Sequence, residues 1–230
     1  MNNTLYSKRT KLADVIASDS KILSILQRLK INLGFGDSTV EEVCNSYNLS
    51  TDLFLNICNI YSYSDYTPDI HALQGKDIAH ITGYLRASHT YYKEVCFPAI
   101  HSKIHFLVKE LDDLSRKLID KFYDDYDSEV INHFRYEESV VFPYVESLLA
   151  GKADNGEFSI SKFQENHSNI GEKLNDLKNI IMKYLPSQYT TALSFEILSD
   201  MYAVENDLYK HSLIENRLLV PLVEKLEQQR

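Results

Sequence analysis

The stretches NHFRYEESVVFP (residues 132–143) and KHSLIENRLLVP (residues 210–221) follow the same spacing. Each has a histidine, a glutamate four residues later and a proline six residues after the glutamate, which is the pattern His-x3-Glu-x5-Pro. The residues that fill it are His133, Glu137 and Pro143 in the first stretch, and His211, Glu215 and Pro221 in the second. Residues four apart on a helix share one face. Each stretch is therefore expected to hold an imidazole beside a carboxylate on a helix.

Two further histidines extend this regularity along most of the chain. His89 precedes His167 by 78 residues, and His133 precedes His211 by the same separation. Equal separations of this kind are typical of two equivalent helical hairpins. The midpoints between successive histidines fall near residues 111, 150 and 189, where the sequences LDDLS, AGKAD and PSQYT indicate turns. The sequence therefore predicts an antiparallel four-helix bundle over residues 70–230, with one histidine of a common layer on each helix.

The expected turns and prolines define this bundle more closely. Turns are predicted near residues 108–116, 150–160 and 185–190. Three prolines fall inside predicted helices, beyond the layer of histidines: Pro98, Pro143 and Pro221. A proline within a helix removes one backbone hydrogen bond, and its ring clashes with the carbonyl four residues earlier. Each of the three helices is therefore expected to lose a hydrogen bond and to bend at its proline.

The composition supports a helical globular protein with a smaller unit before the bundle. Apolar residues make up 44% of the 230 residues, and 7 Gly and 5 Pro leave little material for a turn-rich β protein. The expected fold class is all-α. Residues 1–65 are predicted to form a small helical N-terminal domain, in which Asp37, Ser38 or Thr39 can cap a helix. The polar residues 62–71 are the best candidate for a linker.

Charge, hydropathy and cysteine content exclude several classes of function. The net charge of −9 argues against nucleic acid or an anionic membrane as a partner, because both call for a basic face. No apolar run approaches the roughly 20 residues of a membrane-spanning helix, and the polar N-terminus lacks a signal-peptide core. The three cysteines, Cys44, Cys58 and Cys96, are scattered and form no Cys-x-x-Cys pair. They fit thiols in a reducing compartment, so a cytoplasmic location is expected.

The predicted layer of histidines has the composition of a metal site. Four imidazoles and two carboxylates would converge on the core of the bundle: His89, His133, His167, His211, Glu137 and Glu215. A buried carboxylate is costly unless it is paired with a cation, and two divalent metals bridged by two carboxylates would satisfy this requirement. Nitrogen and oxygen ligands without thiolate favour iron or manganese over a structural zinc site. Six ligands for two metals leave positions open for oxo or hydroxo bridges and for small ligands.

The sequence leaves some assignments around this site open. His89 and His133 are expected to share one metal, and His167 and His211 the other, although spacing alone does not fix this pairing. A single His-x3-Glu pair is more often an ion pair on the surface, but two matched pairs favour the metal site. Glu138 and Glu165 are expected either to support the ligands or to face solvent. The remaining histidines are expected not to bind metal, with His101 and His105 facing solvent and His71 and His80 structural.

Four stretches resemble, in order, the four helix signatures of the hemerythrin-like (HHE cation-binding) family: ASHTYYKEVCFP, NHFRYEESVVFP, ENHSNIGEKL and KHSLIENRLLVP. The chain is most similar to the di-iron branch of this family, the iron–sulfur cluster repair (RIC) proteins. The resemblance implies that the four histidines bind two iron ions and that Glu137 and Glu215 bridge them, with manganese or zinc less favoured. Hemerythrin proper would use five histidines, whereas this chain has four with two glutamates, as the repair proteins do.

The resemblance also covers the segment before the bundle, especially TVEEVC (residues 39–44), with one departure. Family members commonly carry a Cys-Cys-Gly-Gly run just before the matching segment, whereas here the cysteine pair aligns with Leu33 and Gly34. The thiol chemistry of that domain therefore does not carry over to this chain, in which Cys44 stands alone.

Three hypotheses for the function follow. The first is a cytoplasmic di-iron protein of nitrosative and oxidative stress, which acts in the repair of iron–sulfur clusters by binding or reducing NO, or by delivering iron. The second is an O2 or NO carrier or sensor of the hemerythrin type, without turnover, and the third is a structural helical protein. The expected partners are NO, O2 and damaged iron–sulfur proteins, and the protein is expected to be a monomer or a homodimer. Whether it is an enzyme stays open.

Overall fold

The protein is all-helical over the residues that its structure describes. The computed structural model describes residues 5–109, 111–152, 158–165 and 171–229, and no β-strand forms within these ranges. An isolated antiparallel bridge joins Lys11 to Thr39. None of the helices in the described ranges combines the length and apolar character needed to cross a membrane. The predicted all-α class is confirmed.

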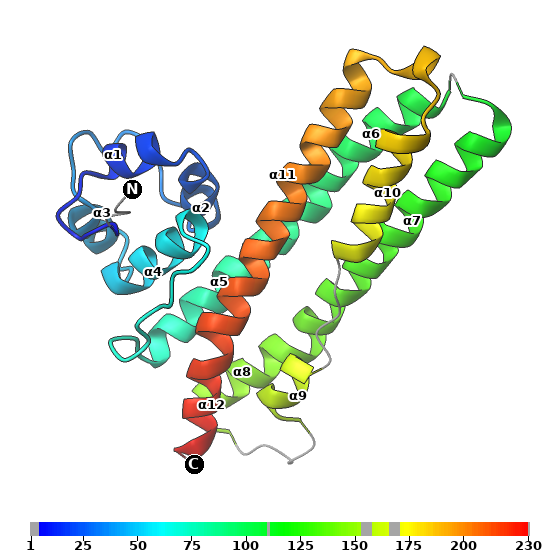
Figure 1. The fold of residues 1–230 in the computed structure, drawn as a ribbon. Helices are drawn as coiled ribbons and strands as arrows, with labels where there is room; N and C mark the ends of the chain where they lie inside the picture. Colours follow the sequence, from blue (N-terminus) through cyan, green and yellow to red (C-terminus); the bar gives the residue numbers. More distant parts are fainter. Residues whose placement is uncertain (1–4, 110, 153–157, 166–170, 230) are drawn as a thin grey trace. The chain divides into compact units, whose positions relative to one another are not determined.

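The helices follow one another along the chain as shown in Figure 1. The first four are short: α1 (Leu12–Ser18), α2 (Ile22–Arg28), α3 (Val40–Ser46) and α4 (Thr51–Ser62). The next four are α5 (Gly75–Tyr91), α6 (Phe97–Val108), α7 (Asp113–Tyr136) and α8 (Phe142–Leu149). The last four are α9 (Ile160–Glu165), α10 (Gly171–Tyr184), α11 (Ala192–Ile214) and α12 (Val220–Gln228).

The chain forms two compact units. The first combines residues 1–88, 144–164 and 210–230, and the second combines residues 89–143 and 165–209. The division expected from the sequence, between residues 65 and 70, lies within the first unit and stays a prediction.

In the first unit, side chains fix the ends of the short N-terminal helices. Thr39 and Glu42 form a capping box at α3, in which each side chain accepts the backbone N–H of the other residue. These hydrogen bonds lower the pKa of Glu42. Thr39 is therefore the residue that caps this helix, among the three that the sequence allowed. Ser50 caps α4, and the inner faces of the helices bury apolar side chains that include Leu12, Ile22, Ile25, Leu53, Phe54 and Ile57.

In the second unit, segments of four helices share one hydrophobic core. Helix α7 packs against α6 and against α10, and α11 runs alongside these helices (Figure 1). Side chains of α11 belong to the same core. Its buried members include Ile104, Leu107, Tyr126, Val130, Leu177, Ile181, Ile197 and Met201. Asp112 caps α7 by accepting the N–H groups of Leu114 and Ser115. The helical period of the apolar residues therefore accounts for the core of this unit.

The helices are interrupted at each of the three places where turns are predicted. The first interruption lies between Val108 and Asp113, and the second between Leu149 and Ile160. Gly151, in the second, has a φ of 70°, a left-handed conformation that glycine adopts without strain. In the third, α10 ends at Tyr184 and a 3-10 turn precedes α11. The turns predicted near residues 108–116 and 185–190 are confirmed, and so is the end of a helix at Leu149, whereas residues 153–157 of the turn predicted near 150–160 lie outside the described part of the chain.

A π turn precedes each of the three prolines, a feature that the sequence did not predict. The turns are Tyr92–Cys96 (η1), Glu137–Val141 (η2) and Glu215–Leu219 (η4). The residue before each proline donates its N–H to the carbonyl five residues earlier, which defines the wider π turn: Phe97 to Tyr92, Phe142 to Glu137 and Val220 to Glu215.

The π turns explain how the prolines are accommodated. A new α-helical segment begins after each turn, and the proline is the second residue of that segment. The first N–H groups of an α-helical segment need no acceptor within it, so a proline fits there. The backbone has already changed its hydrogen-bonding pattern before the proline, which is why the proline does not break a regular α-helix. In all three segments the π turn begins six residues before the proline.

Candidate metal centre

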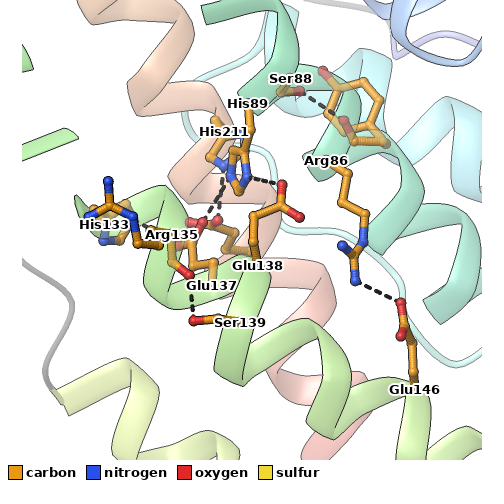
Figure 2. A network of polar contacts seen from close by, with 12 residues as sticks. Arg86, Ser88, His89, His133, Arg135, Glu137, Glu138, Ser139, Glu146 and His211 are labelled. Atoms are coloured by element: carbon orange, nitrogen blue, oxygen red, sulfur yellow. Dashed lines mark hydrogen bonds and ion pairs between the residues drawn. The ribbon is translucent and has the colours of Figure 1, made fainter. Parts of the chain in front are cut away.

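Glu137 is the centre of the contacts among the predicted ligands. It is the first residue of η2 and is fully buried. One carboxylate oxygen, Oε1, lies 2.8 Å from Nε2 of His133, one turn earlier on α7. The other oxygen, Oε2, lies 2.9 Å from Nε2 of His89, which is on α5. A single carboxylate therefore faces two imidazoles, one through each oxygen (Figure 2).

His89 is held on its ring faces and at both nitrogens. Its ring stacks on Phe134 and Phe142, with 4.2 Å and 5.6 Å between ring centroids. Nδ1 lies 2.9 Å from Oε1 of Glu138, the neighbour of Glu137 in η2 (Figure 2). A neutral imidazole donates from one nitrogen only, so donation from Nδ1 to Glu138 leaves the lone pair of Nε2 directed at Glu137. This lone pair and the carboxylate repel each other unless a proton or a metal ion lies between them.

The second His-x3-Glu pair has the same local geometry as the first. Nε2 of His211 lies 2.9 Å from Oε1 of Glu215, and the two side chains are 3% and 1% exposed. Glu215 is the first residue of η4, as Glu137 is of η2. The repeated sequence pattern therefore corresponds to a repeated local structure: a histidine on an α-helix, a glutamate that opens a π turn, and a proline in the next segment.

Four of the six predicted ligands form one group that could hold a metal ion. A ligand atom from each of His89, Glu137, His211 and Glu215 lies within 4.8 Å of the other three, and all four residues are buried. His133 is not one of the four, but it contacts Glu137 through the second carboxylate oxygen. The predicted ligand His167 lies outside the described residues.

The distances between facing atoms suit a metal ion. Nitrogen and oxygen ligands lie ~2.1 Å from a bound transition metal, so two ligands at right angles about the ion are roughly 3.0 Å apart. The three His–Glu contacts, at 2.9, 2.8 and 2.9 Å, are compatible with that separation, which is also the usual length of an N–H···O hydrogen bond. The group offers imidazole nitrogen and carboxylate oxygen without thiolate, which suits iron, manganese or zinc. A cation would also compensate the two carboxylates, whose burial is otherwise unfavourable.

The histidines that the sequence placed outside the site do not belong to this group. His101 and His105 are exposed, as predicted, and the ring of His101 stacks on Tyr123 with 5.1 Å between centroids. His71 is exposed and His80 is half-buried. Their interpretation as structural residues stays a prediction.

Two polar contacts near the ligands are defined only by the structure. Glu138, for which a supporting role and a solvated face were both open, contacts His89, whereas the side chain of Glu165 lies outside the described part of the chain. Tyr92 is fully buried, and its hydroxyl donates to Oδ2 of Asp207 at 2.7 Å. The sequence does contain a signal that could have identified Tyr92. It lies six residues before Pro98, and both glutamates of the repeated pattern lie six residues before a proline.

Comparison with known families agrees with this geometry. The family model described as hemerythrin HHE cation binding domain matches residues 80–223, which include all six predicted ligands. Comparisons with curated proteins and with solved structures give no significant match. The matched residues make up more than half of the chain. The chain therefore belongs to the hemerythrin family of HHE cation-binding domains.

Proposed function

We propose that this protein is a non-haem di-iron protein in which six side chains on a four-helix bundle hold two iron ions. The bundle would span residues 70–230, after a small helical domain of residues 1–65. Four histidines would provide the nitrogen ligands, and two glutamates would bridge the ions: His89, His133, His167, His211, Glu137 and Glu215. The observation that carries the proposal is Glu137, whose two oxygens face the Nε2 atoms of two different histidines.

The contacts of Glu137 also change the expected pairing of the histidines. A carboxylate that bridges two ions directs one oxygen at each ion. Oε2 of Glu137 faces His89 and Oε1 faces His133, so these two histidines would bind different ions rather than share one. On this assignment, His89 and His211 would belong to one ion, and His133 and His167 to the other.

The surroundings of His89 support its role as a ligand. Stacking on Phe134 and Phe142 fixes the plane of the ring, and the contact with Glu138 favours the tautomer that has its lone pair on Nε2. Carboxylates that accept the outer N–H of a histidine commonly orient metal-binding imidazoles in this way. These contacts would therefore orient His89 as a metal ligand.

Six ligands for two ions leave coordination positions open for small molecules. When bound, iron would supply a change of oxidation state and sites for diatomic molecules such as NO and O2. The role of the chain would be to hold the ligands in a buried site and to keep bulk water away from it. We propose that the protein binds these molecules in the cytoplasm, during nitrosative and oxidative stress. There it would serve the repair of iron–sulfur clusters, through NO or O2 chemistry or through delivery of iron.

The test combines metal content with a genetic assay. Protein from iron-supplemented cells should carry about two iron ions per chain, and a strain without the protein should recover the activity of an iron–sulfur enzyme more slowly after exposure to NO. The parent gene should restore recovery, whereas a gene encoding Glu137→Leu should not. Glu146→Leu is the matched control, because Glu146 is a half-exposed glutamate whose ion pair with Arg86 lies on the surface. Normal recovery in the null strain would contradict the repair role.

A second candidate function, reversible binding or sensing of O2 or NO, is favoured by the burial of the site. His89, Glu137 and Glu215 are each 0% exposed, which suits a small gas better than direct contact with a cluster on another protein. Reversible changes in the optical spectrum on addition and removal of the gas, without product, would support this function over repair.

A further inference from the structure

Lys210, the residue before His211, reaches the end of helix α4. Its side chain is buried, and its Nζ donates to the carbonyl of Ile60 at 2.9 Å. Ile60 lies in the last turn of α4. The carbonyls of a last turn have no N–H donor within the helix, and they form the negative end of the helix dipole. A lysine ammonium at this position therefore donates a hydrogen bond to a carbonyl at the end of the helix.

Arg217, two residues after Glu215, reaches the segment that follows the same helix. It lies within η4, and its Nη1 donates to the carbonyls of Tyr66 and Ser64 at 2.6 Å and 3.2 Å. Lys210 and Arg217 thus stand on either side of a predicted ligand pair, and both bind backbone carbonyls of residues 60–66. Each contact lies within the first unit of the molecule.

Residues 60–66 also form hydrogen bonds with residues of the N-terminal segment. The hydroxyl of Tyr61 accepts a hydrogen bond from Nη1 of Arg28 on α2, at 2.6 Å, and Arg28 is only 5% exposed. Oγ of Ser62 donates to Oδ2 of Asp19 at 2.8 Å and accepts from the hydroxyl of Tyr6 at 3.0 Å. The carbonyls that Lys210 and Arg217 bind therefore belong to a segment with a fixed conformation.

The cysteines of the N-terminal helices do not suggest a competing role for this part of the chain. Burial raises the pKa of Cys44 to about 12 and holds the pKa of Cys58 well above its usual value. The thiolate is the form that binds metals and acts as a nucleophile, so both groups stay as thiols at neutral pH. Through Lys210 and Arg217, hydrogen bonds connect residues 60–66 to the segment that carries His211 and Glu215.

We propose that Lys210 and Arg217 are positioning residues, through which the N-terminal helices hold the segment that carries His211 and Glu215. The N-terminal helices would thereby set how tightly the protein retains a metal ion at this pair. The effect on metal rests on the proposed function, because it requires His211 and Glu215 to be ligands. The mechanical effect on residues 210–219 does not.

The test uses the full chain with Lys210→Met and Arg217→Met, singly and together. Methionine keeps most of the volume of each side chain but removes the charge and the donors. The matched control is Lys103→Met, since Lys103 forms its ion pairs with Asp200 and Glu196 in the second unit. Lys210→Arg is the conservative variant, because arginine retains a donor and a charge.

Two measurements separate this proposal from the proposed function. Hydrogen exchange of the metal-free proteins should be faster at residues 210–219 in the double variant, and unchanged there in Lys103→Met. With ferrous iron bound, the double variant should release iron to a chelator roughly tenfold faster, as expected for the loss of hydrogen bonds from charged donors. Lys210→Arg should release iron at close to the parent rate.

Unchanged exchange at residues 210–219 in a folded double variant would overturn the proposal, whether or not the protein binds iron. Faster exchange with unchanged iron release would also overturn it, since the segment would then move without affecting the site. If the parent itself binds no iron, the proposed function fails and the exchange measurement alone decides whether the N-terminal helices hold this segment. Arg217→Met keeps the test usable if the buried Lys210→Met variant does not fold.

Discussion

Three segments of the chain share a backbone feature, a π turn that begins six residues before a proline, but they differ in the residue that opens the turn. Glu137 and Glu215 open two of the turns and face histidines. Tyr92 opens the third and donates to Asp207. All three opening side chains are fully buried. The comparison shows that the proline accompanies a backbone geometry, whereas the first residue of the turn determines the chemistry at that place.

The largest effect is expected where the opening residue is a carboxylate. Glu137→Leu and Glu215→Leu should each reduce iron from about two ions per chain to less than one, because each removes a ligand proposed to be shared by both ions. Elemental measurement of protein from iron-supplemented cells, with circular dichroism to check folding, tests this. Equal iron content in the parent and in both variants would show that the glutamates are not ligands.

The second prediction compares the residues that follow the two glutamates. Glu138 contacts His89, whereas its counterpart Asn216 donates to Oγ of Ser212 at 3.2 Å. Glu138→Leu should lower iron affinity by about tenfold or more, the usual effect of removing a carboxylate that orients a histidine ligand. Asn216→Leu should change the affinity little. Competition with a chelator measures both, and Glu138→Gln, which keeps an acceptor for Nδ1, should fall between Glu138→Leu and the parent.

The predictions from helical spacing succeeded where the chain is regular and were incomplete where it is not. A repeat of four residues was enough to place His133 beside Glu137 and His211 beside Glu215, because those pairs lie at the end of regular α-helix. The same spacing puts Glu138 about 100° round the helix from Glu137. In a π turn the rotation per residue is smaller, so Glu137 and Glu138 can face the two nitrogens of one imidazole.

Other features depend on contacts that no spacing reveals. The proposed pairing of histidines rests on which oxygen of Glu137 each imidazole meets, and that geometry arises from packing between helices far apart in the sequence. The contacts of Lys210 and Arg217 with residues 60–66 span about 150 residues of chain. By contrast, the turn positions were predictable because they follow from local turn signals and from the equal spacing of the histidines along the sequence.

A smaller effect is expected from the prolines. Pro143→Ala restores a backbone N–H and removes the ring that would clash with a carbonyl in a regular α-helix, so such a helix becomes possible around Glu137. The resulting rotation of Glu137 should lower iron affinity several-fold. Pro98→Ala should have less effect, because Tyr92 rather than a carboxylate opens that turn. Equal losses of affinity in the two variants would show that the prolines act on the whole helix and not on the residue that opens the turn.

The smallest effect is expected at the third turn itself. Tyr92→Phe removes the hydroxyl that donates to Asp207 and keeps the buried ring. Unfolding by urea should show a loss of ~1 kcal/mol in the free energy of unfolding, the usual value for one hydrogen bond, with unchanged iron content. Loss of iron from this variant would mean that the third turn also belongs to the metal site, contrary to the comparison of the three turns.

The Mössbauer spectrum of the full chain loaded with iron-57 can show directly whether Glu137 and Glu215 bridge two iron ions. If Glu137 and Glu215 bridge two ions, the parent and Glu146→Leu should show magnetically coupled iron pairs, and Glu137→Leu and Glu215→Leu should each show only uncoupled iron or none. A parent spectrum of isolated iron ions, or coupled pairs that persist in both glutamate variants, would contradict the account.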